Sequence, residues 1–183
     1  MPSFPIHIHG IYIAPQHKVF GHQDPDDLSG ADLKSLETAN LIAHSGIEGD
    51  RFCRNRPDYN GHITFFSLEV WNEVKTSLKL PDTVGPEVAR RNVIISGIDL
   101  KALYEQAFEI QGIQFQGKVH CSPCAAMNQA LAAGARAALR SRGGLRAQIL
   151  SSGELKSGVS QLTSEADCSP ANAATQLKLP NIP

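Results

Sequence analysis

The residues of this chain that most directly suggest a chemical role are two cysteines three positions apart. Cys121 and Cys124 follow an alternating apolar stretch and precede a helix predicted over 123–133. Ser122 is a favourable N-cap, and Pro123 suits the first helical position, where its missing N–H costs nothing. Cys124 is then expected in the first turn of the helix, where the positive end of the helix dipole favours a thiolate. A thiolate attacks electrophiles and binds soft metals, so the pattern predicts one of these roles for Cys124.

Other roles for the pair remain open from the residues alone. A Cys-x-x-Cys pair is half of a structural zinc site, but such a site needs two further ligands and the sequence has no second paired motif. A thioredoxin-like redox pair belongs near the front of a βαβ unit, whereas this pair lies two-thirds along the chain. Two buried structural cysteines are the third alternative.

Three polar clusters elsewhere contain candidate anion ligands. Arg90 and Arg91, beside Asn92, precede an apolar strand, and guanidinium groups match the oxygens of a phosphate. Asp50 and Arg51 lie in a turn that could hold a fixed ion pair at a pocket mouth. Arg142 belongs to a Gly-flanked basic segment whose backbone N–H groups could approach an anion. Each cluster also has a simpler interpretation: a solvated basic pair, an ordinary turn, or a helix end with a glycine stop.

The histidines give a weaker signal. His7 and His9 share one face of a predicted strand over 6–13, and without a third ligand we expect a surface or core role for them. His62 and His120 flank apolar strands and are candidate acid–base groups near the thiols.

Short strands dominate the expected secondary structure. They cover residues 6–13, 38–44, 62–66, 93–95, 108–110, 113–119 and 145–150. Helices are expected from Ser67 to about Leu78, with Trp71 in the core, and at 123–132 and 135–141. Few helices and no βαβ rhythm predict a mainly β (α+β) fold, a barrel with helical insertions. Beyond Gly158 the composition shifts to Ser, Ala, Asn and Pro, so residues 159–183 are expected to form a poorly ordered tail.

The length and net charge of the chain exclude some classes of function. The 183 residues fit one domain, and a formal net charge of -1 argues against general nucleic-acid binding. No apolar run approaches the roughly 20 residues that span a bilayer, and no signal peptide is evident. We therefore expect a cytoplasmic protein with no nucleic-acid or membrane partner. Its four cysteines are then expected to be reactive or metal-binding rather than disulfide-bonded.

Taken in order, the motifs resemble the MOSC domain family, named for the C-terminal domain of molybdenum cofactor sulfurase. The matching segments are GIEGDR (46–51), HITFFSLE (62–69), RRNV with SGIDL (90–100), FEI with FQG (108–117), PCAAM (123–127), RGGLRA (142–147) and SG (152–153). The similarity covers residues 38–158 and the first strand. It assigns residues 1–158 to a MOSC domain.

The resemblance implies a MOSC-type β-barrel with a cleft for the molybdenum cofactor (molybdopterin). Family members reduce N-hydroxylated compounds at molybdenum or are proposed to handle sulfur. The family's key cysteine falls on Cys124, whose thiolate would ligate molybdenum beside the pterin dithiolene. Asp50, Arg51, Arg91, Asn92 and Arg142 are then the candidates for binding the pterin and its phosphate.

The resemblance also implies the partners. The leading interpretation is an oxidoreductase that reduces N-hydroxylated or N-oxygenated small molecules. Its electrons would come from a separate donor protein, since no flavin or nicotinamide fingerprint is visible. The alternative is a sulfur carrier with a persulfide on Cys124, supplied by a sulfur donor, or a cofactor-binding module without turnover. Cys121 is additional to the family pattern and could form a disulfide with Cys124 or resolve its persulfide. The aminotransferase-like sulfurase domain is not seen, so no pyridoxal-phosphate lysine is identified.

Overall fold

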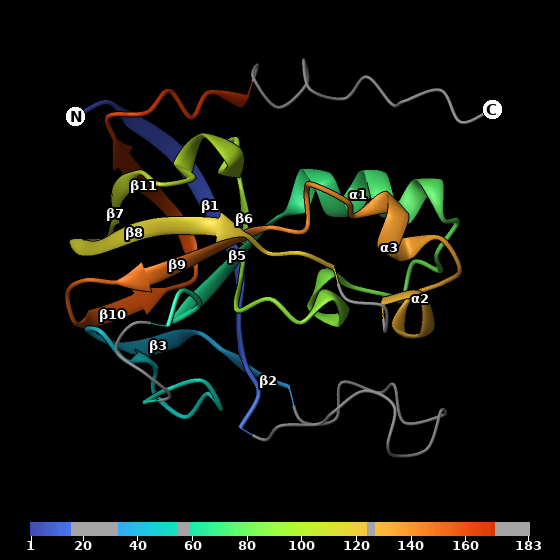
Figure 1. The fold of residues 1–183 in the computed structure, drawn as a ribbon, viewed down its shortest axis with the longest axis horizontal. Helices are drawn as coiled ribbons and strands as arrows, with labels where there is room; N and C mark the ends of the chain where they lie inside the picture. Colours follow the sequence, from blue (N-terminus) through green and yellow to red (C-terminus); the bar gives the residue numbers. More distant parts are fainter. Residues whose placement is uncertain (16–32, 55–58, 124–126, 171–183) are drawn as a thin grey trace.

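A closed barrel of seven β-strands forms the body of the chain (Figure 1). The computed structural model describes residues 1–15, 33–54, 59–123 and 127–170. The β5–β6 pair is parallel, whereas the other barrel pairs are antiparallel. The strands follow one another around the barrel in the order β1 (Ser3–Ile13), β11 (Gly158–Ser164), β7 (Ala107–Ile110), β8 (Ile113–His120), β9 (Leu145–Ile149), β5 (Ile63–Ser67) and β6 (Val93–Ser96), and β6 pairs back with β1. The mainly β barrel expected from the sequence is confirmed.

In the described part of the chain, four further strands lie outside the closed ring. β2 (Lys34–Leu36) pairs with the far end of β1. β10 (Gly153–Lys156), β3 (Thr38–Ile42) and β4 (Gly46–Ile47) form a second, antiparallel sheet. The loop between β4 and β5 therefore begins next to this small sheet and ends in the barrel wall.

The barrel is filled by side chains that alternate along its strands. Ile6 and Ile8 of β1 point inward and are almost fully buried, while His7 and His9 point outward. Phe65, Phe108 and Phe115 meet at the centre with ring centroids 5.1 to 5.7 Å apart. Burying an aromatic side chain of this size contributes about 2 to 3 kcal/mol, so the barrel interior is a packed core.

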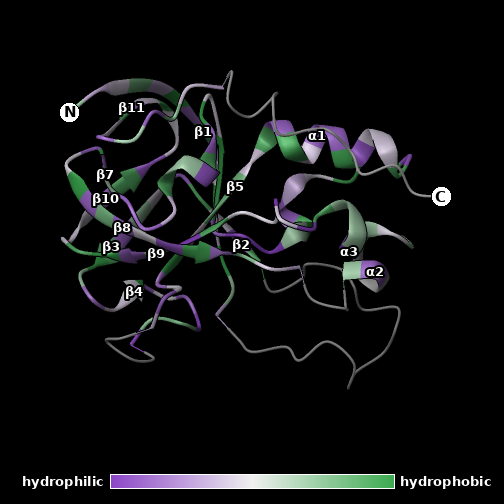
Figure 2. Ribbon diagram, turned by 45° about the horizontal axis from the view of Figure 1, so that its top comes forward, coloured by the Kyte–Doolittle hydropathy of each residue, from purple (hydrophilic) through white to green (hydrophobic). Residues whose placement is uncertain are grey.

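A second core lies outside the barrel, between its wall and the helices. α1 (Leu68–Ser77), α2 (Met127–Ala130) and α3 (Ala135–Ala138) gather on one side of the barrel (Figure 1). Hydrophobic and hydrophilic residues alternate along α1 (Figure 2). Trp71 packs there with Phe66 and Ile94, which lie on the outer faces of β5 and β6. Short 3-10 helices occupy Pro86–Ala89 and Leu100–Leu103. The predicted helix start is confirmed, because the Ser67 hydroxyl accepts a hydrogen bond from the Val70 N–H at 3.1 Å.

The C-terminal part of the prediction needs correction. Residues 159–164 do not belong to a poorly ordered tail, because they form β11, which pairs with β1 on one side and β7 on the other. Cys168, beyond this strand, is fully buried. The barrel therefore extends past the domain end expected at residue 158, and residues 171–183 lie outside the described part of the chain.

The predicted helices after the Cys-Ser-Pro-Cys run extend further towards the C-terminus than the observed ones, which end at Ala130 and Ala138. α2 and α3 have four residues each. The predicted helix start at 123–126 falls largely outside the described residues. Within the described residues, no helix is long and apolar enough to cross a membrane.

Candidate functional site

A pocket of about 280 Å³ lies on the outer face of the barrel wall. Thr64 of β5 and Arg146 of β9 are cross-strand partners that line it. Their neighbours Phe65 and Leu145 point the other way, into the barrel core. The remaining lining residues come from six other segments: the end of β1, the residue before β2, the loop after β4, the entry to β6, the end of β8 and the start of α2. They are Tyr12, Ala14, Leu33, Asp50, Arg51, Phe52, Tyr59, Gly61, Arg90, Arg91, Asn92, Cys121, Ser122 and Met127.

Asn92 fixes three strands around this pocket. Its Oδ1 accepts hydrogen bonds from the Thr64 N–H at 3.0 Å and the Thr64 hydroxyl at 2.8 Å. Its Nδ2 donates to the Tyr12 carbonyl at 3.0 Å. The side-chain amide of Asn92 thus joins β5 to β1 at the entry to β6. Its hydrogen bonds of 2.8 to 3.0 Å are all made to Thr64 and Tyr12 of the protein itself.

Asp50 anchors the loop that carries Arg51. One carboxylate oxygen accepts from the Ala14 N–H at 3.0 Å, and the other accepts from the Phe52 N–H at 3.0 Å. The Arg51 N–H donates in turn to the Ala14 carbonyl at 3.0 Å. Asp50 therefore holds the loop to the end of β1.

Arg91 is buried and acts as a structural clamp, because its guanidinium donates hydrogen bonds to three backbone carbonyls. Its Nε donates to the Gly143 carbonyl and its Nη1 to the Ala89 carbonyl, both at 2.8 Å. Its Nη2 donates to the Cys121 carbonyl at 3.4 Å. Only 8% of the residue is exposed, so the guanidinium ties together three segments that are distant in sequence.

Arg51 is arranged differently from Arg91. Its Nη1 is buried and has no hydrogen-bond partner, and its guanidinium lies 4.7 Å from the centre of the Phe52 ring. Burial lowers the pKa of Arg51, against the raising effect of Asp50 and Tyr59. Phe52 stacks on Tyr59 with centroids 5.5 Å apart. A buried cationic donor that lacks an acceptor is suited to an anionic ligand, because hydrogen bonds between charged groups are strong.

Cys121 and Arg146 both line the pocket. Cys121 is 3% exposed, and its N–H donates to the Gly144 carbonyl at 2.8 Å. Burial on its own would lower the pKa of Arg146. The charge of Cys121, a hydrogen bond to its side chain and the nearby Tyr59 raise that pKa above its ordinary value. The pocket lining therefore includes a thiol and a guanidinium whose charges influence one another.

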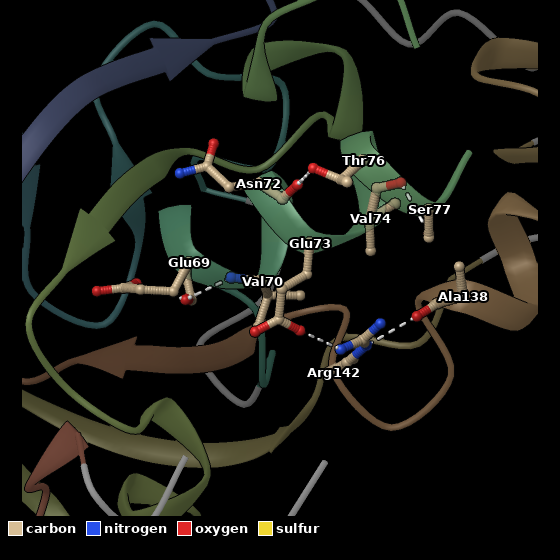
Figure 3. A network of polar contacts seen from close by, with 10 residues as sticks. Glu69, Val70, Asn72, Glu73, Val74, Thr76, Ser77, Ala138 and Arg142 are labelled. Atoms are coloured by element: carbon tan, nitrogen blue, oxygen red, sulfur yellow. Dashed lines mark hydrogen bonds and ion pairs between the residues drawn. The ribbon is translucent and has the colours of Figure 1, made fainter. Parts of the chain in front are cut away.

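Among the described residues that were predicted to bind the cofactor, the structure brings all but one together. Asp50, Arg51, Arg91 and Asn92 all line the pocket. Arg142 does not: its Nη1 contacts the Glu73 carboxylate at 2.7 Å and its Nε donates to the Ala138 carbonyl, which fixes α3 to α1 (Figure 3).

The predicted metal ligand cannot be placed. Cys124 lies outside the described residues, so its predicted role as thiolate ligand stays a prediction from the sequence. Among the residues that the structure describes, no group of three His, Cys, Asp or Glu side chains is arranged to hold a metal ion.

Sequence reasoning missed Arg146 and Tyr59 as pocket residues. Arg146 could have been found, since it alternates with Leu145 and Ala147 in a predicted strand whose apolar face must point inward. Tyr59 gives no such signal, because it follows a polar loop.

The histidines singled out in the sequence lie elsewhere. His7 and His9 stack on each other with centroids 4.2 Å apart, on the outside of β1. His62 is buried, and its Nδ1 accepts from the Ile149 N–H at 3.2 Å. His120 stacks on Tyr104, and its Nδ1 is buried without a hydrogen-bond partner.

Comparison with known proteins adds the family and the fold. A family model of the MOSC domain matches residues 58–160. A search of curated proteins found no match. The fold is similar to that of the YuaD protein from Bacillus subtilis, with a TM-score of 0.67 and 18% identity over 89% of this chain and 98% of that one. It is also similar to YiiM from Escherichia coli, with a TM-score of 0.57 and 14% identity over 96% of this chain and 77% of that one. YiiM from Geobacillus stearothermophilus gives a TM-score of 0.60 and 14% identity over 87% of this chain and 74% of that one.

Proposed function

The chain belongs to the MOSC domain family, and we propose that its outer-wall pocket binds the molybdenum cofactor. We further propose that the protein uses this cofactor to reduce N-hydroxylated or N-oxygenated small molecules, with electrons from a separate donor protein. The single observation that supports cofactor binding best is the buried Nη1 of Arg51, which has no partner in the protein.

The residues present fit such a group. The cofactor carries a phosphate and a pterin ring, and the pocket offers the guanidinium groups of Arg51 and Arg146 beside the aromatic rings of Phe52 and Tyr59. Its volume of about 280 Å³ is just below the usual range for small-molecule sites, which begins at about 300 Å³. A basic, partly aromatic pocket of this kind suits a planar anion.

The chain's own residues divide into two roles in this proposal. Arg51 and Arg146 bind the anionic part of the cofactor, because both are cations that line the pocket. Asp50, Arg91 and Asn92, which the sequence placed on the cofactor itself, hold the pocket walls through backbone contacts. This division assigns ligand binding to Arg51, whose buried Nη1 has no partner in the protein, together with Arg146 beside it in the pocket lining.

The metal ligand in this proposal comes from the sequence alone. Cys124 is proposed as the thiolate that ligates molybdenum, since a thiolate is a ligand that soft metals prefer. When bound, the cofactor supplies the redox chemistry that takes oxygen from the substrate. The protein contributes binding, orientation and a shaped site.

The test is the molybdenum and pterin content of protein made in a cofactor-competent host. We expect wild type to retain both, Arg51→Met to lose most of both, and Cys124→Ser to lose the metal. Arg140→Met removes an exposed arginine and serves as the matched control that retains both. Equal molybdenum in wild type and Cys124→Ser would exclude direct ligation by Cys124. Equal pterin in wild type and Arg51→Met would exclude this pocket.

A sulfur-carrier role is the second candidate, because the pocket holds a thiol, Cys121, that could resolve a persulfide on Cys124. After exposure to a sulfur donor, mass spectrometry would then find a reductant-sensitive sulfur adduct on Cys124. An unmodified thiol there, together with bound molybdenum, would favour the oxidoreductase.

A further inference from the structure

We propose that Asn60 is a site of spontaneous deamidation, and that the isoaspartate formed there weakens anion binding in the outer-wall pocket. Asn60 and Gly61 make the one Asn-Gly pair in the sequence. The pair lies in the turn just before β5. The modification itself does not depend on the proposed function, whereas its effect on the pocket rests on that function.

A glycine after an asparagine favours ring closure between the two residues. The backbone nitrogen of Gly61 loses its proton and attacks the side-chain carbonyl carbon of Asn60, which closes a five-membered succinimide ring and releases ammonia. Glycine has no Cβ to obstruct this attack. Water then hydrolyses one of the two ring carbonyls and leaves aspartate or isoaspartate. The sum is an amide plus water giving a carboxylate plus ammonium, so the reaction needs no oxidant and no enzyme.

The surroundings of Asn60 leave its side chain available for this reaction. The residue is exposed, and no described residue forms a hydrogen bond with its side-chain amide or with the Gly61 N–H. Asn40 is also exposed, but it lies in β3 ahead of Leu41, and its Nδ2 donates to the Glu48 carboxylate at 3.0 Å. Exposure is therefore shared by the two asparagines, whereas the following glycine and the unbonded amide belong to Asn60.

The other described asparagines are held by the fold. Asn92 uses its side-chain amide to bond Thr64 and Tyr12. Asn72 lies in α1, where helical backbone angles turn the next peptide nitrogen away from the side chain. Asn128 begins near the start of α2, and its Oδ1 accepts from the Arg136 N–H at 2.8 Å. Asn60 thus differs from these asparagines both in the residue that follows it and in its setting.

Asn60 lies between two residues of the pocket wall. Tyr59 precedes it and Gly61 follows it, and both line the pocket. The Tyr59 ring folds over Gly61, because a Cβ atom on the glycine would lie 3.1 to 3.2 Å from atoms of that ring. Tyr59 stacks on Phe52 at 5.5 Å, and the Phe52 ring lies 4.7 Å from the Arg51 guanidinium. A change in the backbone at Asn60 therefore reaches Arg51 through two aromatic rings.

Isoaspartate changes both the backbone and the charge at this position. The main chain then runs through the former side chain, which adds one carbon atom between Tyr59 and Gly61. The Tyr59 ring is displaced from its place over the glycine, and its stack on Phe52 loosens. The new carboxylate also lies next to a pocket whose lining cations are proposed to hold an anion, and like charges repel. The anion affinity of the pocket is therefore expected to fall as the protein ages.

Peptide mapping of the purified protein during incubation at mildly alkaline pH tests the modification. We expect Asn60 to deamidate about tenfold faster than Asn40 or more, because only Asn60 is followed by glycine. The rate should rise with pH, since the Gly61 nitrogen must lose its proton. Asn60→Gln should stay unmodified over the same period, because its longer side chain would have to close a six-membered ring. Deamidation of Asn40 or Asn72 as fast as that of Asn60, or an intact Asn60 after prolonged incubation, would overturn the proposal.

Binding of pterin-6-carboxylate, a fluorescent planar anion, tests the effect on the pocket. Asn60→Asp, which adds the charge alone, should bind the probe about two- to fivefold more weakly than fresh protein, and salt should reduce this loss. The isoaspartate form, separated by ion exchange, should lose at least as much affinity and keep most of the loss in salt, because its backbone has changed. Asn60→Gln should bind like fresh protein, and circular dichroism checks that each form is folded.

The two halves of the proposal fail separately. Equal affinity of the fresh and isoaspartate forms would overturn the effect on the pocket. Fresh protein that does not bind the probe would refute that effect together with the proposed function of the pocket. Peptide mapping decides the deamidation of Asn60 in either case, because it requires no ligand.

Discussion

Replacing Arg91 by Met tests whether this arginine is a structural clamp or a ligand for the cofactor. The substitution removes two hydrogen bonds of 2.8 Å, to the Gly143 and Ala89 carbonyls, and a longer one of 3.4 Å to Cys121. A hydrogen bond from a charged donor contributes about 1.5 to 3 kcal/mol, and a buried carbonyl left without a donor adds a cost. With the residue only 8% exposed, water cannot replace these donors.

We therefore expect Arg91→Met to lower the free energy of unfolding by about 3 to 5 kcal/mol. Arg91→Lys should lower it by about 2 kcal/mol, because one ammonium group cannot reach three carbonyls. Equilibrium unfolding in urea, followed by circular dichroism, gives these values from the transition midpoint and slope.

Arg142→Met is the matched control, since its ion pair with Glu73 is partly exposed and should contribute about 1 kcal/mol or less. The reasoning fails if Arg91→Met costs less than about 1 kcal/mol while pterin binding is lost, because Arg91 would then be a ligand with no clamping role.

Two further predictions concern the same region. Gly143→Ala should lower the free energy of unfolding by about 2 kcal/mol or more in urea titrations, since its Cβ would meet the Cys121 carbonyl oxygen at 2.3 Å; a loss below about 0.5 kcal/mol would mean that the two segments separate freely. Burial, with Arg91, Lys101 and Arg146, lowers the pKa of His120 below 6.5, so the folded state binds fewer protons than the unfolded chain. The neutral His120 side chain makes its full contribution to stability above pH 6.5, and that contribution is lost as the pH falls. His120→Gln should therefore flatten the decline in melting temperature below pH 6.5. An unchanged decline would contradict this prediction.

Local patterns predicted most of the fold. The alternation of Ile6, His7, Ile8 and His9 was enough to place β1 with its correct inward face. The serine before α1 was enough to place the helix start. β11 was missed because its outer face is polar and only Leu162 and Ser164 are buried, so little in its own sequence marks it as a strand. Its stability comes from two partner strands that are remote in sequence.

The site was predicted as a set of residues but not as a set of roles. The family resemblance made both Arg51 and Arg91 candidate ligands of the cofactor. The sequence could not show which arginine would donate its hydrogen bonds to the protein. That depends on the Gly143 carbonyl, which lies 52 residues from Arg91 along the chain. The burial of one guanidinium atom without a partner, at Arg51, is likewise set by packing among distant segments.

The pairing of β1 with β11 has a consequence for how the chain is made. Ser3 lies opposite Thr163, so one edge of β1 lacks its partner until the ribosome has produced nearly the whole barrel. An unpaired strand edge can recruit other chains, and pairings between remote segments form slowly. The nascent protein must therefore protect that edge throughout synthesis. Chains that stop before residue 158 should aggregate rather than accumulate as a smaller folded domain.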